Sequence, residues 1–176
     1  MRSNERHRYK RWQACWAPGK VSFAGRFVSF DDMYVSPKPT QPPPVWIGGA
    51  SDAALRRAAR FAAVWQPTPL PIAQLIDGQA TLREACAAIG RPPIPTRMSF
   101  RVELSTITGN APPSGKERPT GWGTPDQVVE DLRRYRTAAD LDSFHINFHG
   151  NRDLGQLLRS MECFMADVAP AVCSMG

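Results

Sequence analysis

The apolar residues of this chain follow two different periods, which separate predicted strands from predicted helices. Short continuous or alternating apolar runs predict strands at 45–47, 64–65, 97–105 and 144–148. Apolar residues that recur every three or four positions predict helices at 4–16, 52–62, 72–89, 125–139 and 154–168. Strands and helices alternate from residue 45 onward, which is typical of parallel βαβ units. The pattern therefore predicts an α/β fold with four consecutive β/α units.

Local signals refine several of these elements. Ser51 is a suitable N-cap, and the run from Thr124 to Gln127 reads as a capping box with proline in the first turn. Ala24 and Gly25 predict a tight hairpin turn between strands at 21–23 and 26–30. The apolar run 45–47 is typical of a strand buried on both faces. The last helix is expected to bury one stripe, made of Leu154, Leu157, Leu158, Met161, Met165 and Val168.

Length and composition limit the class of protein. A complete eight-stranded α/β barrel needs about 250 residues, and this chain has 176. We expect one domain, 1–176, with a basic helical arm (1–20), a hairpin and proline-rich lead-in (21–44) and the β/α units (45–176). No apolar run approaches the roughly 20 residues of a membrane span, and no secretory signal is recognised. The four cysteines are scattered, so we expect reduced thiols and a cytoplasmic protein.

The net charge of +6 is unevenly distributed. The first eleven residues contain five cationic side chains and one carboxylate, Glu5. Such an arm can bind nucleic acid or an anionic surface, or it can simply be the solvated start of a helix. Because no nucleic-acid-reading motif accompanies the charge, a nucleic-acid partner is not expected.

The turn after the strand at 45–47 is the first candidate for chemistry. It consists of Gly48, Gly49, Ala50 and Ser51, directly before a helix. Glycines let a backbone approach an anion, and free N–H groups together with the helix dipole favour phosphate. The alternative is that the glycines only allow close packing between strand and helix.

Polar side chains occupy one face of each of two predicted strands. In an α/β barrel such a face lines the interior, and active sites lie at the carboxyl ends of the strands. His149 is the best placed of these residues, although ordinary hydrogen-bonded interior side chains remain the alternative. His145 and His149 lack a third ligand, so no metal site is expected. The candidate pocket-lining residues are Arg101, Glu103, His145, Asn147 and His149.

Two segments carry a family resemblance. The stretch from Val21 to Trp65, with its SPKP and GGAS motifs, and the stretch GTPDQVVEDLRRYR from Gly123 to Arg136 resemble the second half of luciferase-like flavin or deazaflavin oxidoreductases. The resemblance implies a TIM barrel, (β/α)8, of which this chain forms about the last four units. It also implies an oxidoreductase or monooxygenase that uses coenzyme F420 (deazaflavin) or FMN. Gly48 to Ser51 would then lie against the cofactor phosphate.

The resemblance also implies a missing first half. An isolated half-barrel has open sheet edges, which invite pairing with another chain. We therefore expect self-association or a barrel-completing chain, and the alternative function is an inactive half-barrel that acts as an interaction module. The family commonly has glycine before the strand at Trp65 and after the helix that ends near Asp140. This chain has Ala62-Ala63-Val64 at the first place and Ala138-Ala139-Asp140-Leu141 at the second, with an expected strain of about 1 kcal/mol each.

Overall fold

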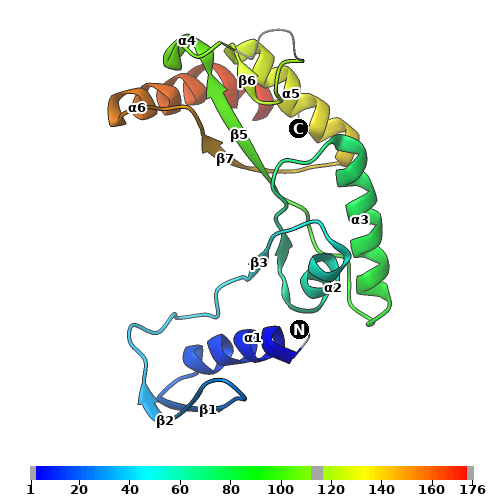
Figure 1. Ribbon diagram of the computed structural model, residues 1–176, viewed down its shortest axis with the longest axis vertical. Helices are drawn as coiled ribbons and strands as arrows, with labels where there is room; N and C mark the ends of the chain where they lie inside the picture. The colour runs from blue at the N-terminus through cyan, green and yellow to red at the C-terminus, as the bar shows by residue number, and fades with distance from the viewer. Residues whose placement is uncertain (1–2, 112–116, 174–176) are drawn as a thin grey trace. The chain divides into compact units, whose positions relative to one another are not determined.

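The computed structural model describes residues 3–111 and 117–173. Its contacts divide the chain into two compact units, residues 1–45 and residues 46–176 (Figure 1). Each unit is described by itself below.

The first unit is a helix followed by an antiparallel hairpin. Helix α1 spans Ser3–Trp16, β1 spans Lys20–Ala24 and β2 spans Ser29–Tyr34. The hairpin was expected, but the prediction that its second strand begins at Arg26 is wrong. Phe23 pairs with Phe30 and Ala24 with Ser29, so the turn is longer than two residues. Within it, the Gly25 N–H donates to Ser29 Oγ at 3.2 Å.

The second unit alternates strands and helices along the whole of its length. In chain order its elements are β3 (Trp46–Ile47), α2 (Asp52–Phe61), β4 (Val64–Trp65), α3 (Ile72–Ala87), β5 (Met98–Leu104), α4 (Ser105–Thr108), β6 (Trp122–Gly123), α5 (Pro125–Ala139), β7 (Phe144–Phe148), α6 (Leu154–Cys163), a π-helical turn (Phe164–Val168) and α7 (Ala169–Cys173). All strand pairs here are parallel: β3 with β4, and β5 with both β6 and β7. A parallel bridge between Trp65 and Thr96 links β4 to the approach of β5. The α/β prediction is confirmed, although the sheets are small and not closed.

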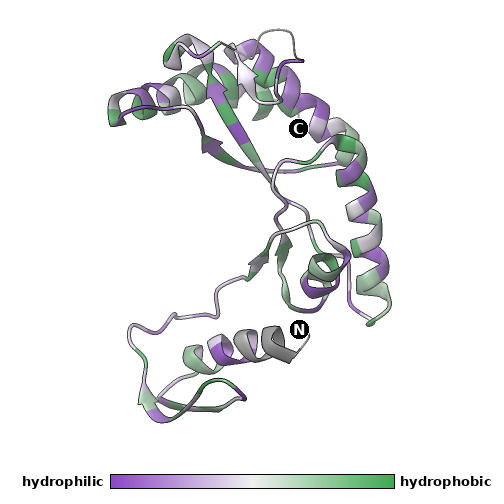
Figure 2. Ribbon diagram, in the orientation of Figure 1, coloured by the Kyte–Doolittle hydropathy of each residue, from purple (hydrophilic) through white to green (hydrophobic). Residues whose placement is uncertain are grey.

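The core lies between one face of β5 and the helices. Along β5 every second side chain is buried, and the exposed fraction of Met98, Phe100, Val102 and Leu104 is 1% or less. This alternation is visible as changing colour along β5 in Figure 2. Phe100 meets Tyr135 of α5 edge-on, with ring centroids 5.8 Å apart. Helix α2 begins as predicted, with Ser51 Oγ accepting the Ala54 N–H, and α5 begins with the predicted capping box at Thr124.

Strand β3 does not have the predicted burial on both faces. Ile47 is 4% exposed, but Trp46 is 38% exposed. The Arg97 guanidinium lies 5.5 Å from the Trp46 ring centroid, within cation–π range. One face of this short strand is therefore buried and the other is partly open to solvent, so the run of apolar residues overstated its burial.

The last helix buries only part of the predicted stripe, since Val168 is buried and Leu157 is half-buried but the other four members are exposed. Ser160, Phe164 and Val168 are buried, whereas Leu154, Leu158, Met161 and Met165 are 44–68% exposed. Phe164 meets Phe148 of β7 edge-on at 5.6 Å, which fixes the face that α6 turns toward the sheet. Both sets have helical spacing, so periodicity alone could not choose between them.

Candidate functional site

The Gly48–Ser51 turn lies at the carboxyl end of β3 and leads into α2. All four residues are exposed, and Gly49 has φ +85°, a conformation that favours glycine. The turn is fixed from beneath, because the indole Nε1 of buried Trp65 donates to the Gly49 carbonyl oxygen at 2.8 Å. The result is an exposed backbone turn beside a helix N-terminus, held in place by the core.

The charge around this turn is mixed. Asp52 occupies the first turn of α2, and its carboxylate lies 3.9 Å from the Arg56 guanidinium. A carboxylate at this position already interacts with the helix dipole. It also reduces the attraction of the turn for a second anion, which the sequence reasoning had not considered.

The polar residues of β5 and β7 share one face of the sheet. The parallel register places Ser99 beside His145 and Arg101 beside Asn147, and Asn147 Nδ2 donates to Ser99 Oγ at 2.7 Å. The Asn147 amide thus links the two strands, and Asn147 is not among the residues that line the cavity described next. His145 is exposed near the start of β7, away from the carboxyl ends of the strands.

Three of the five predicted pocket residues line one cavity at the carboxyl end of β5. Arg101, Glu103 and His149 line a space of about 230 Å³. The peptide N–H of His149 donates to the Val102 carbonyl at 2.7 Å, which holds the segment after β7 beside β5. The other lining residues are Pro119, Thr120, Gly121 and Trp122.

Glu103 is the buried charge of this cavity. It is 6% exposed, and its Oε1 accepts from Asn110 Nδ2 at 2.5 Å and from Thr108 Oγ1 at 3.4 Å. Gly150 (φ +74°) lies against the carboxylate, and a Cβ at that position would overlap it. The side chain is therefore held firmly by neutral groups.

The wall of the cavity between Pro119 and Trp122 was not predicted from the sequence. It is held by Arg118, whose guanidinium forms two hydrogen bonds with Asp131 of α5, at 2.7 and 3.0 Å. Arg118 also donates to the Trp122 carbonyl at 2.6 Å, and Asp131 accepts the Gly121 N–H at 2.7 Å. The hydrogen bond with Asp131 raises the pKa of Arg118, against the opposing effect of burial.

The sequence gives little indication that residues 119–122 form a wall of the cavity. Strand β6 has only two residues, too few for a periodic pattern. An acidic residue on the buried face of the predicted 125–139 helix was the available clue, because buried carboxylates are usually paired.

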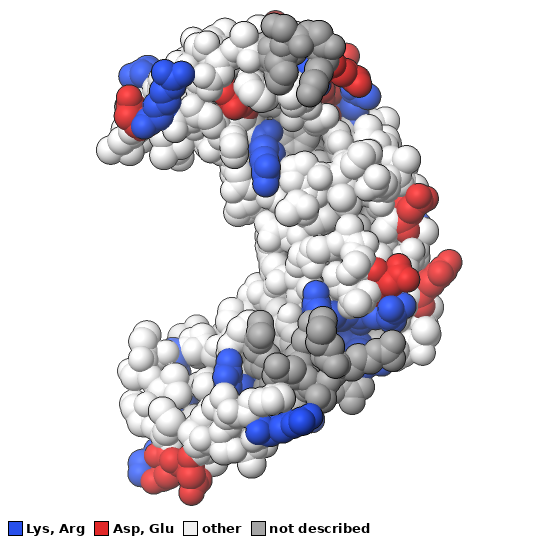
Figure 3. All heavy atoms as spheres, in the orientation of Figure 1, with Lys and Arg blue, Asp and Glu red and all other residues white. Residues whose placement is uncertain are grey.

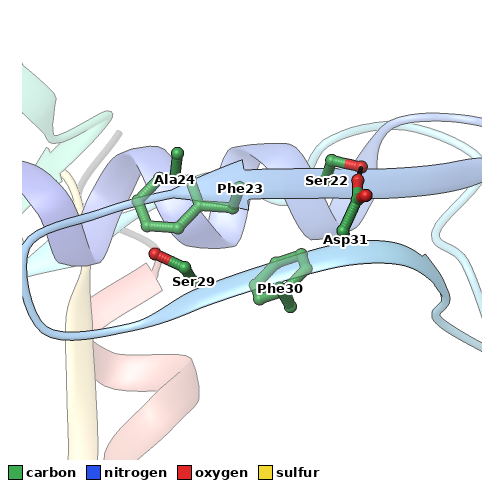
Figure 4. A pocket seen from close by; sticks show the side chains of 6 residues that line it. All are labelled: Ser22, Phe23, Ala24, Ser29, Phe30 and Asp31. Carbon is green, nitrogen blue, oxygen red and sulfur yellow. Dashed lines mark hydrogen bonds between the residues drawn. The ribbon is translucent and has the colours of Figure 1, made fainter.

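Other candidate features carry less chemistry. The hairpin of the first unit has a hollow of about 650 Å³ lined by Phe23, Phe30 and four smaller residues (Figure 4). Its carboxylate, Asp31, already accepts a hydrogen bond from Ser22. Within residues 3–111 and 117–173 there is no group of three or more His, Cys, Asp or Glu side chains placed to hold a metal ion, and no helix long and apolar enough to cross a membrane.

The basic arm lies only partly within the described residues. Arg2 is outside them, and the side chains of Arg6 and Arg8 are not described. On the face drawn in Figure 3, Lys and Arg side chains are interspersed with Asp and Glu rather than gathered in one patch.

Comparison with known proteins identifies the class. The model of the luciferase-like monooxygenase family matches residues 8–112, and the chain belongs to this family. A segment of 47 residues is 45% identical to the pyrimidine monooxygenase RutA of Escherichia coli (strain SMS-3-5 / SECEC), covering 27% of this chain and 13% of that protein.

Solved structures share the fold. An F420-dependent secondary alcohol dehydrogenase, in complex with an F420–acetone adduct, matches 93% of this chain with TM-score 0.69 and 13% identity. Riboflavin lyase RcaE, solved with modified FMN and riboflavin, matches 99% with TM-score 0.67 and 14% identity. The chain covers 59% and 58% of these two structures. The fold is thus that of the luciferase-like TIM-barrel family, over about three fifths of the length of these two structures.

Proposed function

We propose that this chain is the cofactor-phosphate-binding part of a flavin-type oxidoreductase, with Gly48 to Ser51 as the phosphate site. The observation that carries the proposal is the exposed turn at the carboxyl end of β3, with left-handed Gly49 at its centre. Helix N-termini preceded by glycine-rich turns are well suited to phosphate. The family membership and the F420- and FMN-containing neighbours support a cofactor of this kind.

The residues of the turn fit a phosphate group in shape better than in charge. A Cβ at Gly49 would lie 3.1 Å from Ala54 Cβ, so the turn is close-packed on its helix side and open on the other. Ser51 Oγ is engaged as the N-cap, accepting from Ala54 at 3.3 Å. We therefore assign phosphate binding mainly to backbone N–H groups, and a flavin-type cofactor bound there would supply the redox chemistry.

The test is a fluorescence titration of the full chain with F420 and, in parallel, with FMN. We expect saturable binding, weakened about tenfold by Gly49→Ala, because a Cβ is strained at φ +85° and crowds Ala54. Gly90→Ala is the matched control, since Gly90 also has positive φ but nothing near its Cβ position. Asp52→Asn should tighten binding by removing a carboxylate from the same helix N-terminus. Absence of saturable binding by the folded chain would refute the proposal.

The substrate side of the site is assigned to the polar face of β5 and β7. In the proposal, Arg101, Glu103, His145, Asn147 and His149 belong to the pocket wall of the complete barrel. Three of them, Arg101, Glu103 and His149, line one cavity at the carboxyl end of β5.

The alternative function is that of an interaction module that completes a barrel without catalysing a reaction itself. It is favoured by the exposed apolar stripe of the last helix, Leu154, Leu158, Met161 and Met165. It is also favoured by strands β3 and β7, each of which has only one strand neighbour among the described residues. Cofactor binding by the chain alone distinguishes the two functions.

A further inference from the structure

The carboxylate of Glu103 is incompletely satisfied in a way that points to a ligand. Both hydrogen bonds that reach it end on Oε1. Within the part of the chain that the structure describes, no ion pair involves Glu103, although the residue is only 6% exposed. Removing a carboxylate from water without a cation or further donors is unfavourable. Its second oxygen, Oε2, therefore has capacity for a donor from outside the chain.

Arg101 provides the opposite chemistry in the same cavity. It lies two residues before Glu103 on the same face of β5, and its side chain is exposed. No hydrogen bond or ion pair of the Arg101 side chain occurs among the described residues, so its guanidinium can donate to a ligand. The cavity thus combines one acceptor held by hydrogen bonds, Glu103, with one exposed donor, Arg101.

The size and the wall residues of the cavity limit the chemical class of ligand that it can hold. The space of about 230 Å³ is smaller than the roughly 300–1,000 Å³ of drug-sized pockets. Pro119 and Trp122 are also among the wall residues, and the buried indole N–H of Trp122 has no hydrogen-bond partner among the described residues. A small ring suits these walls if it carries a hydrogen-bond donor beside an acceptor.

We propose that Glu103 and Arg101 recognise the substrate, with Glu103 accepting an N–H and Arg101 donating to the neighbouring carbonyl oxygen of a small amide or imide. The inference rests on the proposed function, because it names the substrate class for the pocket assigned there. Thr108 and Asn110 are positioning residues, since their hydrogen bonds hold Oε1 and leave Oε2 available. Gly150 allows the carboxylate to lie against the backbone.

The experiment is an NMR titration of the ¹⁵N-labelled full chain with succinimide and with N-methylsuccinimide. The two probes share a ring and both carbonyl groups, but only succinimide has an N–H. We expect succinimide to bind about tenfold more tightly, the factor that one hydrogen bond to a charged group supplies. Shifted amide signals should include those of Thr120, Gly121 and Trp122, which line the cavity.

Substitutions separate recognition from a structural role. Glu103→Gln should reduce the preference for succinimide below about threefold, while Glu162→Gln, at an exposed position on α6, should leave it unchanged. Arg101→Ala should weaken both probes by similar factors, because both retain their carbonyl oxygens. Circular dichroism of each variant confirms that the fold is kept.

Three outcomes would overturn the inference: no saturable shift with either probe, equal affinity for both, or an unchanged preference in Glu103→Gln. The cofactor titration reports on residues 48–51 instead. If the chain failed to bind either cofactor but still preferred succinimide, the proposed function would be refuted and the imide site would stand. If the chain bound a cofactor but showed no preference for succinimide, only the imide site would be refuted.

Discussion

Asp140 ends α5 in a conformation that favours glycine. Its φ and ψ are 48° and 52°, and its N–H donates to the Arg136 carbonyl oxygen. Asp tolerates this left-handed region better than most residues, but glycine has no Cβ penalty there. We expect Asp140→Gly to raise the free energy of unfolding by about 0.5–1 kcal/mol, measured by urea denaturation.

A nearby aspartate supplies the control. Asp142 is also exposed, but it is not among the residues with positive φ. Asp142→Gly should lower the free energy of unfolding, because glycine increases the entropy of the unfolded chain. If both substitutions had the same effect, the strain assigned to Asp140 would be refuted.

At the scale of single residues, backbone chemistry was easier to predict than side-chain environment. The left-handed end of α5 at Asp140 followed from a glycine position filled by another residue. The same reasoning was wrong at Ala62, which is extended, with φ −83° and ψ 146°. Because Ala62 is extended at the end of α2, no residue there needs a conformation that favours glycine, and the strain expected for Ala62 to Val64 does not arise. The burial of Glu103 could not be predicted, because it depends on Asn110 in the loop after α4 and on Gly150, which is distant in sequence.

The two-residue strand β6 depends on the Arg118–Asp131 pair for its position on α5. The Asp131 side chain is 3% exposed and that of Arg118 is 24% exposed. Removing one partner of a buried pair leaves an uncompensated charge. We therefore expect Arg118→Met to lower the free energy of unfolding by about 3 kcal/mol, measured by chemical denaturation.

The matched control is on the same helix as Asp131. Arg134 is exposed, so Arg134→Met should change the free energy of unfolding by less than about 0.5 kcal/mol. A similar small change in both variants would show that the pair does not hold the cavity wall.

At the scale of elements, capped and periodic segments were predictable and short ones were not. Ser51 and Thr124 start α2 and α5 as predicted because their side chains satisfy N–H groups locally. Strand β6 and helix α4 have two and four residues, and tertiary contacts rather than local pattern determine them. The choice between two apolar stripes on the last helix likewise depended on Phe148, a contact from another strand.

At the scale of the whole molecule, the parallel α/β order could be predicted because alternating elements leave few other arrangements. The sequence also predicted a shared polar face on β5 and β7, since the period of a strand is two. It did not predict which of those residues line one cavity. That outcome depends on the strand register and on a loop whose sequence has no period.

The exposed stripe on the last helix gives the final prediction, which concerns association. Leu158 and Met161 are 49% and 44% exposed on one face, flanked by Leu154 and Met165. Burying one such side chain stabilises a contact by roughly 1.5–3 kcal/mol. We therefore expect the purified chain to self-associate, and Leu158→Glu or Met161→Glu to raise the dissociation constant at least about tenfold.

Sedimentation velocity over a range of protein concentrations measures this constant. Arg159→Glu introduces a carboxylate at a neighbouring exposed position, and it should have a smaller effect because it removes no apolar contact. A wild-type chain that stayed monomeric at every concentration and unfolded cooperatively would contradict the prediction. It would mean that these apolar side chains remain exposed to solvent in the folded monomer, and that this β/α segment is stable without another chain to cover them.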